Sequence, residues 1–371
     1  MEGSTLAKLS RERSTVSNRV AQVRHERSNG SESGKQQSRR RARENGEQAT
    51  RLATEGAADI GSDLVGLAES ERSTTFGRRP GPVVAVTGAA RGLGLALTAR
   101  LAACPQVGRV VAIDDHRGDV TGVTWRVVDV RDPVLAGRLA GVDVVVHTDL
   151  DLAPDSEVRS RRAFNVRGAQ TVLTAAAAGG VGRVVLVTSA MVYGAESDNP
   201  VPLPEDSPLR AESDGSVVGD LLEIEHLARR SPRTHPGMQI TVVRPAALVG
   251  DGIDTLITRH FEAPRLLAVK GCGARWQFCH LDDLVSALEL AATGQVTGEL
   301  AVGCDGWLEQ EQLEELSGLR RIELPAGLTF ATAQRLHRAG ITPAPVADLH
   351  YVVYPWVVDC KALRGGLETR V

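Results

Sequence analysis

The chain has 371 residues and a mass of 39.4 kDa; 42% of its residues are hydrophobic and 24% are charged, proportions that are ordinary for a globular protein. No run approaches the roughly 18 apolar residues that cross a bilayer, and no charged start leads into an apolar segment, so we expect neither a membrane protein nor a secreted one. The formal net charge of −3 combines a basic stretch over residues 1–80 with an acidic remainder that carries 28 Lys and Arg against 35 Asp and Glu, and this acidic larger part disfavours a nucleic-acid partner.

Residues 1–80 form the first predicted segment. They are rich in Ser, Arg, Glu, Gln and Gly and poor in aromatic residues. Such a composition buries too little apolar surface to offset the entropy lost on ordering, so we predict a disordered polar and basic tail. The basic stretch from Arg39 to Arg43 could bind a nucleic acid or an anionic surface, but a solvated tail is the favoured interpretation.

Short β-branched runs alternate with Ala- and Leu-rich stretches from residue 81 onward. The expected strands are Val83–Val86, Arg109–Ile113, Thr124–Val128, Asp143–Val146, Arg183–Val187 and Gln239–Val243. The expected helices cover residues 92–103, 133–140, 158–178 and 218–230. Strands that alternate with helices predict βαβ units and therefore an α/β fold with a doubly wound parallel sheet.

A glycine-rich loop with the spacing GxxxGxG follows the first expected strand and precedes the first expected helix. Gly88 permits a tight turn, and Gly92 lets the backbone approach a pyrophosphate. Gly94 lets the helix pack closely on the strand, with the helix N-terminus toward the anion. The loop therefore predicts a dinucleotide site. Its expected contact residues are Gly88, Ala90, Arg91, Gly92, Leu93 and Gly94.

An acidic residue stands where such a site needs one. Asp114 ends the second expected strand, 20 residues beyond Gly94. A carboxylate there accepts hydrogen bonds from the adenosine ribose and repels a 2′-phosphate, so we expect NAD rather than NADP. Asp115 adds to this preference, while Arg91 and Arg117 oppose it. The alternative is that Asp114 caps a turn.

An ordered series of motifs resembles one superfamily. The motifs are Thr87–Gly94, Asp114, Val128–Asp132, Val145–His147, Asn165–Gly168, Arg183–Gly194, Arg244-Pro245 and Gln277–Asp283. Over about residues 82–300 they resemble the extended short-chain dehydrogenase/reductase superfamily, in its NAD-dependent epimerase/dehydratase branch, with a likeness to actinobacterial proteins. The resemblance implies a Rossmann-type core over residues 81–245 and a smaller, mainly substrate-binding C-terminal portion over 246–371.

The resemblance also implies roles for single residues. Asp129 would contact adenine, Asn165 would support the helix beside the active site, and the Ser189 hydroxyl would hydrogen-bond the reacting oxygen. The other implied cofactor contacts are Val130 and His147, and the implied substrate contacts are Tyr193, Arg244 and His280.

The Tyr-Lys pair that this superfamily uses for catalysis is missing. In its YxxxK motif the lysine charge lowers the pKa of the phenol, so that tyrosinate can take a hydroxyl proton near neutral pH. The residues four positions after the three tyrosines of this chain are Ser197, Pro355 and Val358. The segment that should hold the pair has small, apolar or acidic residues instead. The chain therefore lacks the usual base.

The acidic residues near the expected cofactor and catalytic positions have two interpretations each. Asp220, Glu223 and Glu225 could supply a carboxylate base, or they could lie on a solvated face of the helix 218–230, which we favour. Asp149 stands where the family has small, uncharged residues. Pointing at the pyrophosphate, it would weaken cofactor binding by like-charge repulsion; pointing at solvent, it would have no effect.

The implied substrate contacts have structural alternatives as well. Arg244 could pair with an anionic substrate or brace the pocket, and His280 could contact a ligand or be structural. Tyr193 is usual in intact relatives, where it lines the substrate site. In nucleotide-sugar epimerases an Arg often stands four residues before this His, whereas Arg275 stands five before it, so a nucleotide-sugar substrate has weak support.

The five cysteines form no CxxC pair and are widely spaced, so we expect reduced thiols and neither a disulfide framework nor a zinc site. A metal site at Cys272, Cys279 and His280 is not favoured.

Two functions are open. The first is an NAD-dependent epimerase/dehydratase-like oxidoreductase that acts on a sugar-like or other polar alcohol, with Ser189 and an unidentified base. The second is a catalytically degenerate NAD(P)-binding sensor or interaction module. We expect a cytoplasmic protein with a small-molecule substrate and no membrane partner. Relatives often dimerise through helices equivalent to residues 158–178 and 218–230, and we predict a homodimer here.

Overall fold

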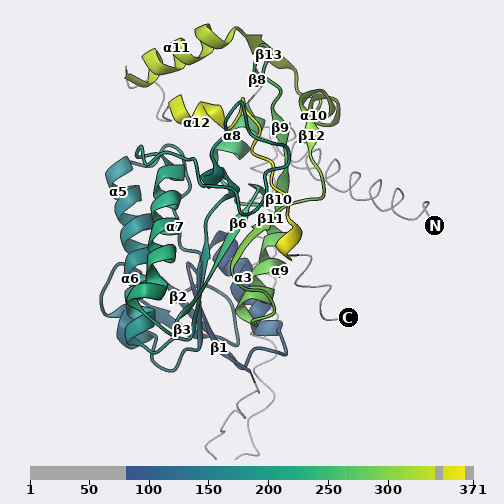
Figure 1. Cartoon of the computed structure of the whole chain (residues 1–371). Helices are drawn as coiled ribbons and strands as arrows, with labels where there is room; N and C mark the ends of the chain where they lie inside the picture. Colours follow the sequence, from purple (N-terminus) through teal and green to yellow (C-terminus); the bar gives the residue numbers. More distant parts are fainter. Residues whose placement is uncertain (1–80, 264, 339–345, 364–371) are drawn as a thin grey trace, which may run out of the picture. The chain divides into compact units, whose positions relative to one another are not determined.

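The computed structural model describes residues 81–263, 265–338 and 346–363 (Figure 1). The predicted tail over residues 1–80 lies outside these ranges. Apart from Leu316–Gly318, the described residues belong to one compact unit. Within them, no helix combines the length and apolar character that a membrane span requires.

A parallel sheet of seven strands forms the centre of this unit, in the order β11-β6-β5-β4-β1-β2-β3. The strands are β1 (Val83–Thr87), β2 (Arg109–Asp114), β3 (Thr124–Val127), β4 (Val144–His147), β5 (Arg183–Val187), β6 (Gln239–Pro245) and β11 (Glu299–Val302). The chain winds outward from β1 to β3 and then returns to β4 on the other side of β1. The predicted doubly wound parallel sheet is confirmed. Each predicted strand is present within two residues of its expected bounds, and β11 was not predicted.

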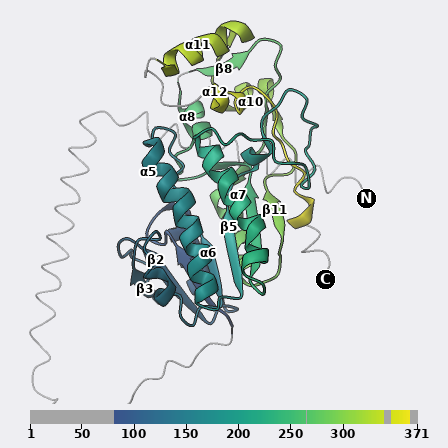
Figure 2. The same ribbon diagram turned by 60° about the vertical axis from the view of Figure 1, so that its left-hand side comes forward.

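Helices cover both faces of the sheet (Figures 1 and 2). One face carries α3 (Gly92–Ala103) and α9 (Leu281–Ala292), and the other carries α4 (Leu135–Arg138), α6 (Gly168–Ala178) and α7 (Val217–Thr234). The stretch predicted as one helix over 158–178 consists of α5 (Val158–Arg162), a π-helical turn (Ala163–Arg167) and α6. Such π turns occur frequently at functional sites.

The side chains of the central strand alternate between the two cores. In β1, Val84 and Val86 join the core formed with α3 and α9, while Val83 and Ala85 join the core formed with α6 and α7. All five β1 residues are buried, as expected of an inner strand of a parallel sheet. Burying a valine side chain contributes about 1.5–3 kcal/mol, so these packed strands fix the positions of the loops at their carboxyl ends.

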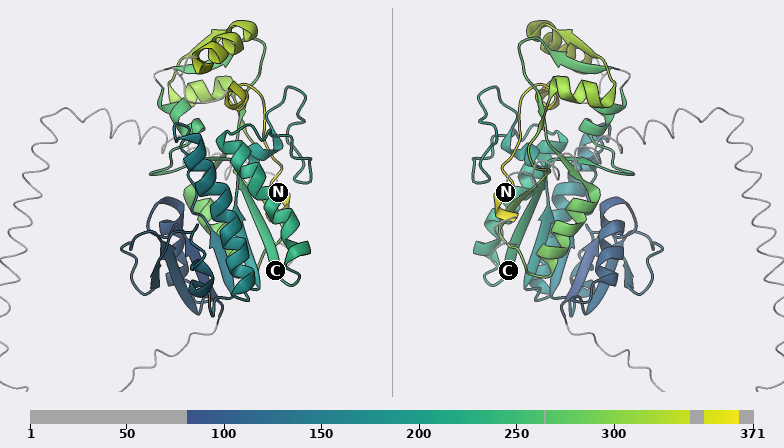
Figure 3. Two further views of the ribbon diagram at one scale, coloured as in Figure 1. Left: turned by 90° about the vertical axis from the view of Figure 1, so that its left-hand side faces the viewer. Right: turned by 90° about the vertical axis from the view of Figure 1, so that its right-hand side faces the viewer.

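A smaller portion follows β6 in the sequence (Figure 3). Its strands pair as β7 (Ala247–Val249) with β10 (Phe278–His280), β8 (Leu266–Val269) with β13 (Arg321–Leu324), and β9 (Arg275–Trp276) with β12 (Leu308–Glu309). Its helices are α8 (Leu256–Glu262), α10 (Gln310–Ser317), α11 (Ala326–Arg338) and α12 (Val346–His350). The residues after β6 also include β11, which is a strand of the seven-stranded sheet, and α9, which packs on that sheet. The regions before and after residue 245 therefore share one sheet.

Side-chain hydrogen bonds fasten the C-terminal segment to this framework. The Gln277 amide donates to the Val358 carbonyl at 2.9 Å, and its oxygen accepts from the Val358 amide at 3.0 Å. The Tyr351 hydroxyl donates to the Met191 carbonyl at 2.9 Å. The segment after α12 is therefore held against the turn that follows β5.

Candidate functional site

The carboxyl ends of β1 and β4 mark the point where the winding of the sheet reverses. The two strands are hydrogen-bonded neighbours, and the helices that follow them, α3 and α6, pack on opposite faces. In open α/β sheets, ligands bind in the crevice at this point. The loop Gly88–Gly94 and the residues Thr148-Asp149 meet there, because the Thr148 hydroxyl donates to the Thr87 carbonyl at 2.6 Å.

Three glycines shape the loop between β1 and α3. Gly88 and Gly92 have φ angles of +69° and +48°, which glycine adopts without a steric penalty. A Cβ at Gly94 would lie 2.1 Å from the Gly88 carbonyl oxygen, whereas a Cβ at Gly92 would have no atom within 4 Å. The N-cap Arg91 makes no side-chain capping bond. The loop thus leaves open space before the N-terminus of α3, whose N–H groups attract anions.

Asp114 is fixed beside this loop. It is fully buried; its Oδ2 accepts the Ala90 amide at 2.9 Å and its Oδ1 accepts the Asp115 amide at 2.8 Å. Burial and the Asp115 carboxyl raise the pKa of Asp114, while the Ala90 amide and Arg91 lower it. Asp114 therefore holds the glycine loop in place through the Ala90 amide, and its contact with the ribose stays a prediction.

Arg91 connects three carboxylates at the crevice. Its Nη2 lies 3.2 Å from Asp114 Oδ1, 3.7 Å from Asp115 Oδ1 and 3.6 Å from Asp149 Oδ1. Asp149 is buried, with its Cα 2.9 Å from where a Cβ of Gly88 would lie. The interpretation that Asp149 points at solvent is therefore wrong.

Asp129 and Val130 follow β3. Arg131 donates to both carboxylate oxygens of Asp129, from Nε at 2.9 Å and from Nη2 at 2.5 Å, and these bonds lower the pKa of Asp129. The Arg131 guanidinium lies 5.4 Å from the centre of the Phe164 ring. The Val130 side chain is buried in the core. A cofactor contact of Val130 would therefore use its backbone, and both contacts stay predictions.

His147 and Asn165 are fully buried. The His147 Nδ1 shares a hydrogen bond with the Thr87 hydroxyl at 2.8 Å, and burial lowers the pKa of His147 to about 4, so the ring is neutral. The Asn165 side chain donates to the Asp151 carbonyl at 2.9 Å and accepts from the Asp151 amide at 2.8 Å. Asn165 thus braces the loop after β4 from the π turn, while direct cofactor contacts of both residues stay predictions.

Ser189 lies at the carboxyl end of β5, where it caps the 3₁₀ turn Ala190–Tyr193. Its Oγ accepts the Met191 amide at 3.2 Å and lies 3.5 Å from the Pro245 carbonyl oxygen. The side chain is partly exposed. This position suits a hydroxyl that meets a ligand above the sheet edge, and its catalytic role stays a prediction.

A buried polar network occupies the adjoining positions. Arg244 donates from Nε and Nη2 to the two oxygens of Glu225, and from Nη1 to the Tyr193 hydroxyl, each at 2.8 Å. Thr188 donates to Glu225 at 2.8 Å, and the Tyr193 hydroxyl donates to the Glu205 carbonyl at 2.7 Å. Arg244 therefore braces the site internally. Substrate contacts of Arg244 and Tyr193 stay predictions.

The predicted solvated face of α7 is wrong for two of its three acidic residues. Asp220 and Glu225 are fully buried, and Asp220 Oδ2 accepts a bond from Arg161 Nε at 3.0 Å. Glu223 is partly exposed. Removing a carboxylate from water requires a partner, and each buried acid has an arginine. Asp220 and Glu225 are therefore structural anions rather than unpaired bases.

His280 is the N-cap of α9, where its Nδ1 accepts the Asp282 amide at 3.2 Å. This capping bond gives His280 the structural role that was the alternative to a ligand contact, and the ligand contact itself stays a prediction. In β9, Arg275 donates to Glu309 at 3.0 Å, and the neighbouring Trp276 ring stacks on His260 at 5.5 Å between centroids. Arg275 is therefore engaged with β12.

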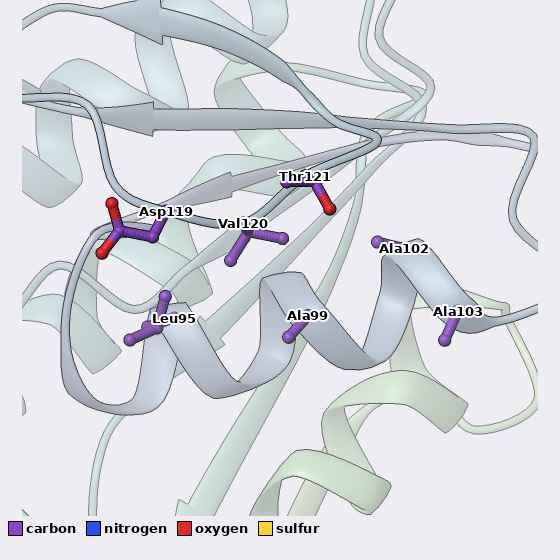
Figure 4. Close-up of a pocket in the computed structure, with 7 residues that line it drawn as sticks. All are labelled: Leu95, Ala99, Ala102, Ala103, Asp119, Val120 and Thr121. Carbon is purple, nitrogen blue, oxygen red and sulfur yellow. The ribbon is translucent and has the colours of Figure 1, made fainter. Parts of the chain in front are cut away.

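A separate hollow of about 550 Å³ lies along α3 (Figure 4). Leu95, Ala99, Ala102 and Ala103 of α3 line it, together with residues 119–121 between β2 and β3. None of the predicted cofactor or substrate contacts lines this hollow, so it is distinct from the crevice between β1 and β4.

Sequence reasoning missed the buried acids of α7, although a signal was present. Glu225 stands four residues after Leu221 and three before Ala228, and both of these side chains are buried. Residues at this spacing share a helix face. A carboxylate inside an apolar stripe requires a buried cation, which here is Arg244. The sequence pattern does not indicate that Thr188 would donate to Glu225 as well.

The family follows from a comparison with known families. The model of the NAD-dependent epimerase/dehydratase family matches residues 84–302, which include the glycine loop, Asp114 and Ser189. The chain belongs to this family. The match confirms the family that the motif series predicted.

Curated relatives support the family without giving an activity. Uncharacterised proteins of Mycobacterium tuberculosis and Mycobacterium bovis are 33% identical to the chain over 297 residues, covering 77% of it and 79% of their own length. An uncharacterised protein of Sinorhizobium fredii is 25% identical over 228 residues, covering 58% of the chain and 55% of its own length.

Solved structures share the fold. MoeE5 in complex with UDP-glucuronic acid and NAD is 24% identical, with a TM-score of 0.58, over 77% of this chain and 92% of its own. The UDP-glucose 4-epimerase of Thermotoga maritima is 17% identical, with a TM-score of 0.57, over 76% and 91%. The DesIV dTDP-glucose 4,6-dehydratase of Streptomyces venezuelae, solved as a double mutant with NAD and DAU, is 22% identical, with a TM-score of 0.56, over 76% and 89%. At these identities the likeness concerns the fold alone.

Proposed function

We propose that this family member binds NAD in the crevice between β1 and β4. The pyrophosphate would lie over Gly88–Gly94 at the start of α3, and the adenosine ribose would lie beside Asp114. The observation that carries the proposal is the open space at Gly92, next to a helix N-terminus that Gly94 brings close to the strand. These residues fit a dinucleotide, because a phosphate needs close approach to backbone N–H groups.

The proposed substrate is a sugar-like or other polar alcohol. The fold is shared with MoeE5 and with UDP-glucose 4-epimerase, whose structures contain UDP-glucuronic acid and UDP-glucose. NAD, when bound, would supply a hydride acceptor. The Ser189 hydroxyl would hydrogen-bond the reacting oxygen at the carboxyl end of β5. A base other than Asp220 and Glu225 would take the proton, because these two carboxylates are held in ion pairs.

A second candidate is a catalytically degenerate NAD(P)-binding sensor or interaction module. The observation in its favour is the segment from Ser216 to Glu225, which has small, apolar or acidic residues and no YxxxK motif, with Asp220 held by Arg161. A protein of this kind would keep the nucleotide site and change conformation or partners with the NAD(P) that it binds.

Calorimetric titration of the full chain with NAD, NADP and their reduced forms tests the nucleotide site. We expect NAD to bind at micromolar concentration and about tenfold more tightly than NADP, because the carboxylates of Asp114 and Asp115 repel a 2′-phosphate. Equal affinities would contradict the role of Asp114, and no binding of any of the four would contradict the proposed function.

A substrate screen separates the two candidates. The NAD-loaded protein is incubated with UDP- and dTDP-sugars, and products are followed by chromatography and by NADH absorbance. The enzyme is supported if the wild type turns over a substrate and Ser189→Ala does not, while the NAD affinity of the two proteins is the same. NAD binding without any turnover supports the sensor.

We infer a homodimer formed through α6 and α7. Both helices lie on the same sheet face and contact each other, and Gln170, Thr174 and Arg230 on them are exposed. Light scattering at micromolar concentration should give twice the mass of the chain; a monomer would contradict this inference.

A further inference from the structure

Asp149 places a carboxylate inside the proposed cofactor crevice. It stands two residues after the end of β4, only 6% of its surface is exposed, and its Cα lies against Gly88. The proposed pyrophosphate position over Gly88–Gly94 is therefore next to a buried acid. A phosphate and a carboxylate that both carry charge repel each other strongly at a partly dry site.

The surroundings of Asp149 contain more negative than positive charge. Asp114 and Asp115 at the end of β2, and Asp129 after β3, face it with three further carboxylates. Among the described residues, Arg91 is the cation that forms an ion pair with Asp149, at 3.6 Å. The same Nη2 atom also lies within 3.7 Å of Asp114 and Asp115, so one guanidinium is shared among three acids.

The other titratable groups here are already engaged. His116 Nδ1 lies 2.5 Å from Asp115, and the Arg131 guanidinium holds Asp129. Burial, followed by Asp114, raises the pKa of Asp149 to about 7, although Arg91 opposes this. In the free protein, about half of the Asp149 carboxyl groups therefore carry a proton at neutral pH.

We propose that binding of NAD to the loop Gly88–Gly94 is coupled to uptake of a proton by Asp149, which makes this residue the determinant of how the affinity depends on pH. The inference rests on the proposed function. The protonated carboxyl removes the repulsion toward the pyrophosphate and releases the Arg91 guanidinium, which can then approach the phosphates. Asp149 thus acts as a positioning residue: its protonation state decides whether the Arg91 guanidinium is held by carboxylates or is free to approach the phosphates.

The direction of the effect follows from linkage. The pyrophosphate keeps its charge near neutral pH, so only the protein takes up a proton. The complex holds the proton on Asp149 and the free protein loses it as the pH rises through about 7, so affinity falls with increasing pH. Between pH 6 and pH 8 the Kd for NAD should rise about tenfold, and proton uptake should increase from about half a proton at pH 7 toward one at pH 8.

Calorimetry with NAD at pH 6, 7 and 8, in buffers of different ionisation enthalpy, measures both quantities on the full chain. Asp149→Asn should make the Kd independent of pH and should bind NAD about tenfold more tightly than the wild type at pH 8, with no proton uptake. Asp115→Asn is the matched control, because Asp115 touches the same guanidinium but is half-exposed; it should keep the pH dependence. Thermal unfolding checks that both variants fold, and Asp149→Ser replaces Asp149→Asn if that variant does not.

Three outcomes overturn the inference. One is a wild-type Kd that does not change from pH 6 to pH 8, and another is an unchanged pH dependence in Asp149→Asn; both leave NAD binding itself intact. The third is the absence of NAD binding in every variant at every pH, which overturns the proposed function together with the inference.

Discussion

Gly92→Asp is expected to abolish NAD binding while leaving the fold intact. A Cβ at this position meets no atom within 4 Å, and the φ of +48° lies in a region that aspartate tolerates. The new carboxylate would project into the space proposed for the pyrophosphate. Two like charges about 4 Å apart near a protein surface repel by about 4 kcal/mol, so affinity should fall at least about a hundredfold.

Gly141→Asp is a matched control for this experiment. Gly141 also has a positive φ, +72°, and its Cβ would also meet nothing within 4 Å, but it precedes β4 at the opposite edge of the sheet. Calorimetry with NAD should show wild-type affinity for Gly141→Asp and none for Gly92→Asp, with similar melting temperatures. Wild-type NAD affinity in Gly92→Asp would disprove the proposed position of the pyrophosphate.

The sheet could be predicted from the sequence because its signals are local. Each inner strand is a run of β-branched residues buried on both faces, such as Val83–Thr87. The strand β11, Glu299–Val302, was missed because its Leu and Ala residues give no such run. The π turn at Ala163–Arg167 was missed because a single widened turn leaves the helical pattern almost unchanged.

In the candidate site, too, the features with a local sequence signal could be predicted and the contacts between distant residues could not. The glycine loop and Asp114 could be predicted, since strand, loop and helix follow one another in the chain and the acid stands at a fixed distance. The contacts of Arg161 with Asp220 and of Arg91 with Asp149 join residues that are 58 or more positions apart. Such pairs depend on how helices and strands pack, and one sequence carries no signal that matches one charge with another.

Arg244→Ala is expected to destabilise the protein by about 3–5 kcal/mol, the typical result of removing one partner from a buried ion pair. Arg244 is fully buried, and its guanidinium satisfies both oxygens of Glu225 and the Tyr193 hydroxyl. Without it, the Glu225 carboxylate stays buried with the Thr188 hydroxyl as its remaining hydrogen-bond partner. Urea unfolding at pH 7 measures the loss of free energy as a lower midpoint at an unchanged slope.

Two further variants establish that the unpaired charge causes this loss. Arg100→Ala removes an arginine from a half-exposed pair with Glu289 and should change stability by less than about 1 kcal/mol. Arg244→Met combined with Glu225→Leu removes both buried charges, so it should be more stable than Arg244→Ala. The half-exposed Glu299, which also contacts Arg244, keeps its ion pair with Arg229 in both variants. If the double variant were as unstable as Arg244→Ala, lost packing and not the buried charge would be the cause. A midpoint for Arg244→Ala equal to that of Arg100→Ala would show that water reaches Glu225, and Glu225 would then regain its place as a candidate base for the reaction at Ser189.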